Sequence, residues 1–165
     1  MRRVSSLAVL TLTLASCAQE RDPSQLGQSE IPLPDQPIGG TSTTERRKIE
    51  QAIEPYVKIA RSTYPDAKAR YQSGLPDGSM FFVTVQIHDD AGGMEQAFVQ
   101  VTSIDSGQVA GIIASEMTAI RGFRLGQSHT FSETEILDWT ISNPDGTQEG
   151  NIVGRFLAEW QASRN

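Results

Sequence analysis

The eight residues MFFVTVQI, from Met80 to Ile87, decide the fold. They are rich in β-branched and aromatic side chains, which favour a pleated strand over a helix. The following segment, Asp89–Gly93 (DDAGG), has the composition of a turn. Apolar and polar residues then alternate from Met94 to Ile104, which predicts the returning strand of an antiparallel hairpin.

The sheet is expected to continue on the C-terminal side. Asp105–Gly107 (DSG) is a second tight turn and predicts a third strand over Gln108–Ser115. Such short links join neighbouring strands, so the three strands should form an antiparallel meander. The segment Glu116–Leu125 has no clear period, and we expect a loop that crosses an edge of the sheet.

The stretch from Gly126 to Trp139 (GQSHTFSETEILDW) is predicted to build a corner of the sheet. Strands are expected over Ser128–Phe131 and Ile136–Ile141. Between them, Ser132 and Glu135 have the spacing of a capping box, which predicts one helical turn.

One helix is predicted before this sheet in the sequence and another after it. After a turn at Asn143–Gly146 (NPDG), one apolar face predicts a C-terminal helix: Ile152, Val153, Phe156, Leu157 and Trp160. Before the sheet, a helix should begin near Thr44, with these residues on its apolar face: Ile49, Ala52, Ile53, Tyr56, Val57 and Ala60. Pro55 predicts a kink or the start of a second helix, and Pro65 predicts another break before further turns over Asp66–Gln72. Together these elements predict an α+β domain over residues 43–165 with about five antiparallel strands.

The N-terminus has the features of a secretory signal peptide over residues 1–16. Arg2 and Arg3 give it a basic start, Val4–Leu14 carries no charge, and the small residues of Leu14–Cys17 (LASC) follow. The apolar part is too short for a spanning helix.

The LASC sequence resembles the lipobox of bacterial lipoproteins. That resemblance implies cleavage between Ser16 and Cys17, lipid attachment at Cys17, and a membrane as partner through that lipid. Ala18, where an aspartate would resemble an inner-membrane retention signal, implies the outer membrane, facing the periplasm. Cys17 is the only cysteine, so an internal disulfide and a multi-cysteine zinc site are excluded.

Residues 17–42 are expected to be a flexible tether between lipid and domain. The segment Ala18–Ser42 is rich in proline, glutamine and serine and has no apolar period. A chain of this length reaches roughly 25–30 Å.

The charge balance limits the possible partners. Arg2 and Arg3 are the only charged residues of the signal segment, so the remaining chain carries 12 of the 14 basic residues against all 20 acidic ones, a formal charge of −8. This excess and the absence of a basic run exclude nucleic acid as an expected partner. The acidic excess favours a basic partner, for example a secreted toxin that the protein neutralises.

From Tyr56 onward, an ordered series of short motifs spans about two-thirds of the chain: Ala60–Thr63, Phe82–Val85, Phe98–Val101, Gly107, Gly111, Leu125-Gly126, Ile136, Asp138-Trp139, Glu149–Asn151 and Arg155. In order and spacing this series resembles the YegJ-like family, a bacterial family of unknown function. The resemblance implies a fold and structural roles for Gly111, Gly126, Asp138, Trp139 and Gly150, and it implies no activity. The chain departs from the family at Phe98 (usually Trp), Gln127 (Asp), His129 (apolar) and Ser115–Met117 (Asn-Pro).

Asp138, Glu133, Glu135 and His129 are the weak candidates for acid–base chemistry. Strands disfavour aspartate, so Asp138 is expected to accept backbone or indole hydrogen bonds; the alternative is a carboxylate with a raised pKa in a cleft. Glu133 and Glu135 are expected to cap a turn or face water, and His129 to be a partly buried structural residue. His88 beside Asp89 and Asp90 could bind a divalent ion weakly, but these are expected to be turn residues, so no metal site and no cofactor are predicted.

No G-x-S-x-G elbow and no glycine-rich phosphate loop occurs. We therefore expect a non-catalytic binding domain for a protein or cell-wall component. The alternatives are a small wall-modifying hydrolase that uses Asp138 with Glu133, Glu135 or His129, and a purely structural role at the envelope.

Overall fold

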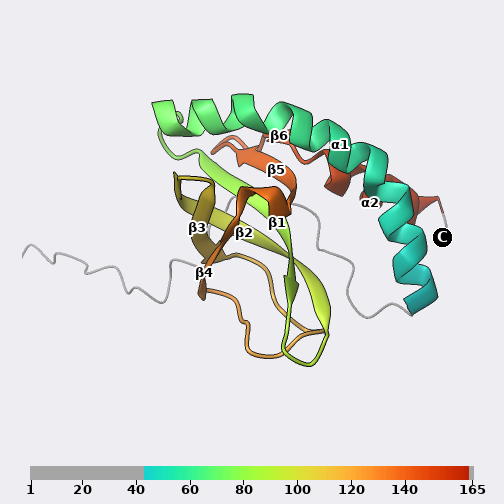
Figure 1. The fold of residues 1–165 in the computed structure, drawn as a ribbon. Helices are drawn as coiled ribbons and strands as arrows, with labels where there is room; N and C mark the ends of the chain where they lie inside the picture. Colours follow the sequence, from blue (N-terminus) through green and yellow to red (C-terminus); the bar gives the residue numbers. More distant parts are fainter. Residues whose placement is uncertain (1–42, 164–165) are drawn as a thin grey trace, which may run out of the picture.

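Six antiparallel strands form one sheet in the order β4-β3-β2-β1-β5-β6 in the computed structural model, which describes residues 43–163 (Figure 1). The elements are α1 (Thr43–Ser73), β1 (Met80–His88), β2 (Met94–Asp105), β3 (Gln108–Ile113), β4 (Ser128–Ser132), the 3₁₀ turn η2 (Glu133–Glu135), β5 (Ile136–Ser142), β6 (Gln148–Gly150) and α2 (Ile152–Ala162). The predicted α+β class is confirmed. The signal peptide, Cys17 and the tether lie outside the described residues.

The predicted hairpins β1–β2 and β2–β3 are both present. Asp105 pairs with Gln108, so the second turn contains only two residues. These residues, Ser106 and Gly107, have φ angles of 49° and 80°. Two positive φ angles match the twist of the flanking strands, which explains why a short polar residue and a glycine occupy these positions.

The sheet has one strand more than predicted. The strand β6 pairs with Thr140–Ser142 of β5 and holds only three residues. A segment this short shows no period, so sequence pattern cannot reveal it. The third strand ends at Ile113 rather than Ser115, and residues 114–127 form the predicted loop.

The break predicted at Pro65 and the second helix considered at Pro55 are both wrong, because α1 runs unbroken through the two prolines. Each proline removes one backbone hydrogen bond, to Gln51 and to Arg61 respectively. All four residues are exposed, so water can satisfy the freed carbonyl groups. Figure 1 shows α1 as one bent helix, and proline is an established cause of such bending.

A continuous apolar stripe explains why α1 stays helical through its two prolines. Its buried members follow helical spacing on both sides of Pro55: Ile49, Ile53, Val57, Ala60, Tyr64 and Ala67. Burying a large apolar side chain contributes about 1.5–3 kcal/mol, whereas a proline in a helix costs about 3 kcal/mol. The stripe therefore outweighs the two prolines.

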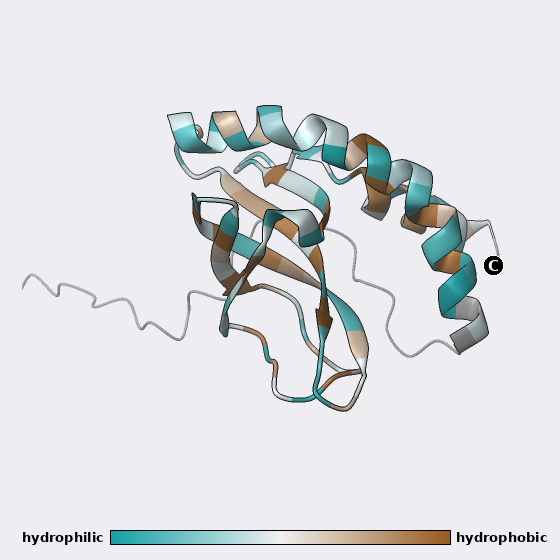
Figure 2. Ribbon diagram, in the orientation of Figure 1, coloured by the Kyte–Doolittle hydropathy of each residue, from teal (hydrophilic) through white to brown (hydrophobic). Residues whose placement is uncertain are grey.

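The main core lies between α1 and one face of the sheet. The strand register places Val83 between Val99 and Trp139, and all three side chains are buried. Tyr64 and Tyr71 of α1 stack on Phe81 of β1, with ring centroids 6.4 and 5.2 Å apart. Figure 2 shows hydrophobic residues concentrated along the strands beneath α1.

A second core joins α2 to the N-terminal half of α1. Its buried members are Ile49, Ile53, Val57, Val153 and Leu157. Tyr56 and Phe156 stack beside them with ring centroids 4.1 Å apart. This core fixes where α2 begins, and the N-terminus of α2 is where the buried acid Asp138 lies. None of the described helices is long and apolar enough to cross a membrane.

Candidate functional site

Asp138 lies where β5 meets the N-terminus of α2. Its carboxylate is 1% exposed. Oδ1 accepts a hydrogen bond from the backbone N–H of Trp139 (2.8 Å), and Oδ2 accepts from those of Val153 (2.7 Å) and Gly154 (3.4 Å). The backbone donors expected for Asp138 are therefore present, and both of its oxygen atoms are used.

The helix α2 has no cap of its own. Its N-cap residue, Asn151, is left-handed with φ 49° and makes no side-chain capping bond, and the first turn contains no acid. Asp138 supplies the missing acceptor from β5, and the positive end of the helix dipole favours its charge. Burial raises the pKa of Asp138, while the backbone N–H groups of Trp139, Val153 and their neighbours act in the opposite direction.

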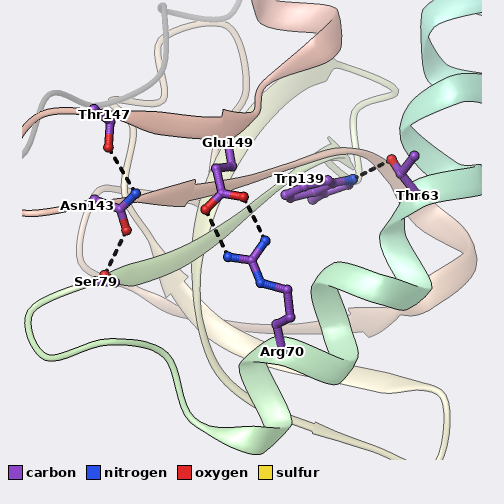
Figure 3. Close-up of polar contacts among 7 residues, drawn as sticks. All are labelled: Thr63, Arg70, Ser79, Trp139, Asn143, Thr147 and Glu149. Atoms are coloured by element: carbon purple, nitrogen blue, oxygen red, sulfur yellow. Dashed lines mark hydrogen bonds and ion pairs between the residues drawn. The ribbon is translucent and has the colours of Figure 1, made fainter.

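Trp139, next to Asp138, links β5 to α1 through a hydrogen bond. Its indole Nε1 donates to Thr63 Oγ1 at 3.0 Å (Figure 3), so the indole does not bind Asp138. Gly150 lies against the same indole with φ 75°, and a Cβ at this position would collide with the ring and backbone of Trp139. Only glycine fits there.

Figure 3 also shows a two-pronged ion pair near this contact. Arg70 of α1 donates to both carboxylate oxygens of Glu149 in β6, at 2.7 and 2.9 Å. In the adjoining turn Asn143 accepts from Ser79 and donates to Thr147. The ion pair links the edge strand β6 to α1, and the Asn143 contacts stabilise the turn before β6.

The two glutamates of η2 are both engaged. Glu135 accepts from the backbone N–H of Ser132 at 2.9 Å and completes the predicted capping box. Glu133 accepts from Lys68 of α1 at 2.6 Å. The side chains of this ion pair are 28% and 19% exposed, so the pair is more than a surface contact.

His129 lies in β4, between two aromatic rings. It meets Phe123 edge-on and stacks on Phe131, with ring centroids 5.6 and 5.4 Å apart. Burial lowers its pKa, and the charge of Glu135 acts in the opposite direction.

The four acid–base candidates do not gather in one cleft. Asp138 is enclosed by backbone groups of α2, His129 is enclosed by aromatic rings of the β4 region, and the two glutamates belong to η2. Within residues 43–163, no group of three His, Cys, Asp or Glu side chains could hold a metal ion. Asp89 binds backbone N–H groups of its own turn, at Ala91 and Gly93.

An open pocket of about 320 Å³ lies between α1 and η2. Arg61, Tyr64, Glu133, Thr134 and Ile136 line it. Arg61 bridges the two elements, because its Nε donates to the carbonyl of Ile136 at 2.7 Å and its Nη2 to that of Thr134 at 3.1 Å. Among the weak candidates, only Glu133 borders this pocket.

Tyr64 is the residue of this pocket that sequence pattern did not single out. It belongs to the apolar stripe of α1 and is 7% exposed. Its hydroxyl oxygen is buried, and the neighbouring carboxylate of Glu133 acts on it by charge and by hydrogen bonding. Burial raises the pKa of Tyr64 strongly, and the charge of Glu133 adds to this effect.

Glu95 is a second buried acid that the sequence did not reveal. It lies in β2, is 7% exposed, and accepts hydrogen bonds from the backbone N–H groups of Thr118, Ala119 and Ile120 at 2.8–3.3 Å. Asp89 accepts from the next N–H, that of Arg121. The β1–β2 hairpin thereby holds loop 114–127. The signal available in the sequence was an acid at an inward position of an alternating strand.

The two remaining glycines of the motif series lie near β3. A Cβ at Gly111 would collide with Val99 and with the backbone of Gln100 in β2. Gly126 has φ 80°, and its N–H donates to the carbonyl of Ile113 at 2.8 Å. Both glycines are therefore required by the backbone geometry around β3.

No protein-family model matches this chain, and no curated protein and no solved structure matches it.

Proposed function

We propose that the protein is a lipid-anchored component of the bacterial cell envelope, held in the outer membrane through Cys17. Its α+β domain binds a protein or a cell-wall component without catalysis. The observation that carries this proposal is the use of Asp138, His129, Glu133 and Glu135 in separate contacts within the domain. A hydrolase would need two of these groups to converge on a substrate.

A binding role is supported by the pocket between α1 and η2. The pocket is open, borders charged and aromatic side chains, and has a volume at the lower end of the range for small-ligand sites. The acidic excess of the chain favours a basic partner, and a secreted toxin fits that description.

A relation to the YegJ-like family is part of the proposal. Its support is that motif residues far apart in the sequence meet in space: Thr63 binds Trp139, and Gly150 packs on the same indole. These contacts give the spaced motifs one shared structural role.

The anchor is tested by the variant Cys17→Ser. Serine lacks the thiol that accepts the diacylglyceryl group, so metabolic labelling with a palmitate analogue should mark the wild-type chain and not the variant. Label on Cys17→Ser, or an unlabelled wild-type chain in the envelope, would contradict the lipoprotein assignment.

The binding role is tested by in-cell crosslinking of the lipidated chain, followed by identification of crosslinked peptides. We expect one partner or wall fragment crosslinked through α1 and η2. An envelope preparation that yields no specific crosslink at low and at moderate salt would contradict the binding role.

A further inference from the structure

The strand β4 forms a free edge of the sheet. It is the first strand in the order β4-β3-β2-β1-β5-β6, so it pairs with β3 on one side and with no described strand on the other. The opposite edge, β6, holds three residues and leads at once into α2. The strand β4 is therefore the edge that offers a longer stretch of backbone to a partner.

The register shows which backbone groups of β4 are already used. Just before β4, the carbonyl of Gln127 accepts the N–H of Ile113 in β3 at 2.9 Å. Bonded and non-bonded pairs alternate along an antiparallel ladder. The alternate residues His129 and Phe131 therefore bond to β3 through both of their backbone groups. Just after β4, the N–H of Glu133 donates to the turn before β3, which continues the same alternation.

Ser128 and Thr130 lie between these positions, so their backbone N–H and C=O groups point away from β3. Both residues are exposed. Lysines, prolines and bulges commonly protect an exposed edge, and β4 has none of the three. Two residues with two groups each leave four backbone groups open to a new strand.

A second copy of the chain fits this edge poorly. A symmetric pairing of two β4 strands about Thr130 would place Ser128 of one copy opposite Ser132 of the other. Ser132 already gives its N–H to Glu135 at 2.9 Å, so the carbonyl of Ser128 would lack its donor in both copies. The acidic excess of the chain also makes two copies repel each other.

The side chains beside the edge indicate what an added strand would contain. On the face that carries Phe131 and the main core, His129 is half-buried and meets Phe123 edge-on. An apolar side chain of an added strand would extend this surface. On the other face Ser128 and Thr130 are exposed, which suits polar or β-branched neighbours. An alternation of apolar and polar residues therefore fits the edge.

We propose that β4 binds an extended segment of a partner protein, which adds a strand to the six-stranded sheet. The segment bonds to the backbone of Ser128 and Thr130, and the acidic excess of the chain favours basic residues in it. The strand β4 leads directly into η2, whose Glu133 and Thr134 line the pocket described above. The inference rests on the proposed binding function and specifies its partner.

Residue-resolved hydrogen exchange of the full lipidated chain in detergent tests the proposal. The probe is the peptide acetyl-Lys-Val-Thr-Val-Thr-Val-Lys-amide at roughly 1 mM, a concentration that detects weak binding. We expect exchange at the N–H groups of Ser128 and Thr130 to slow by at least about twofold, the value for half occupancy. Unchanged exchange at both residues would overturn the proposal.

An N-methylated form of the probe is the matched control. Methyl groups on two adjacent central residues remove a donor from each edge of the peptide and leave its charges and side chains unchanged. Exchange at Ser128 and Thr130 should then equal that of the free chain. Equal slowing by both peptides would show a contact through side chains or charge, and would contradict strand addition.

The variant Thr130→Pro removes one outward N–H. Proline is tolerated in an edge strand where the N–H faces solvent, so the bonds between β3 and β4 should remain. We expect the affinity for the probe to fall by about tenfold or more, because a donor is lost and the ring obstructs the added strand. Thr130→Val keeps the N–H and should bind the probe as the wild type does.

Ser128→Pro repeats the test at the first residue of β4, where a proline disturbs a strand least. It serves as the second variant if Thr130→Pro melts well below the wild type. Wild-type affinity for the probe in a folded proline variant would contradict the role of this edge.

The failure of this site is distinguishable from the failure of the binding function. Specific envelope crosslinks that persist in Thr130→Pro would overturn the edge as the binding site and leave the binding function intact. Absence of crosslinks from the wild-type chain would overturn the binding function and this inference with it.

Discussion

At the scale of single residues, each acidic candidate has a definite hydrogen-bond partner within the domain. Glu135 binds the backbone of Ser132, Glu133 binds Lys68, and Asp138 binds the first turn of α2. His129 lies between the rings of Phe123 and Phe131, and its burial there favours its neutral form. The four candidates lie close together in the sequence but do not form one site.

The lowered pKa of His129 predicts a pH-dependent stability. The unfolded chain takes up a proton near pH 6.5 and the folded chain only at lower pH, so the contribution of neutral His129 is complete above about pH 6.5 and is lost as the pH falls through its folded pKa. Urea unfolding between about pH 7.5 and pH 5 should show a smaller loss for His129→Phe than for the wild type.

His88→Asn is the control for this measurement, since His88 is exposed at the end of β1. It should keep the pH dependence of the wild type. If His129→Phe and the wild type lose equal stability, the buried environment of His129 is wrong.

At the scale of elements, two buried carboxylates join neighbouring elements by accepting backbone N–H groups. Asp138 joins β5 to α2, and Glu95 joins β2 to loop 114–127. In both cases the carboxylate replaces an acceptor that the local backbone does not supply. Loop 114–127 has no regular structure, and the bonds to Glu95 fix its central residues, Thr118, Ala119 and Ile120.

The loop contact predicts a local effect of Glu95→Gln. Both oxygens of Glu95 accept backbone N–H groups, whereas glutamine has one oxygen and would turn an NH₂ group toward a donor. We expect a loss of about 1.5–3 kcal/mol of stability. Hydrogen exchange should accelerate at Thr118–Arg121 more than elsewhere in the domain.

Glu116→Gln is the matched control, since Glu116 is an exposed acid of the same loop. It should leave exchange in the loop unchanged. Wild-type exchange rates in Glu95→Gln would show that the carboxylate does not hold the loop.

At the scale of the whole molecule, the strands, turns and C-terminal helix could be predicted because their signals are local. The capping box of Ser132 and Glu135 spans four residues, and the turn between β2 and β3 spans two. The continuity of α1 through Pro65 could not be predicted, because it depends on packing along the whole stripe. The three-residue strand β6 depends on pairing with β5.

The pocket was beyond prediction for the same reason. Arg61 meets the carbonyl of Ile136 across 75 positions of sequence, and that of Thr134 across 73. Tyr64 follows the apolar period of α1, so its pattern indicates core and gives no sign of the Glu133 carboxylate beside its hydroxyl group. Such contacts depend on how α1, η2 and β5 pack together, which local sequence patterns do not specify.

The central claim is that Asp138 is a structural acid that joins β5 to α2, and Asp138→Asn tests it most directly. An asparagine has one acceptor oxygen where Asp138 uses two, so one backbone N–H would face an NH₂ group. Thermal melts of the full chain at neutral pH should show a loss of about 1.5–3 kcal/mol, which corresponds to several degrees, while the exposed control Asp66→Asn melts as the wild type does. A catalytic carboxylate is often held at a cost in stability. An Asp138→Asn chain that melts at or above the wild type would therefore contradict this account.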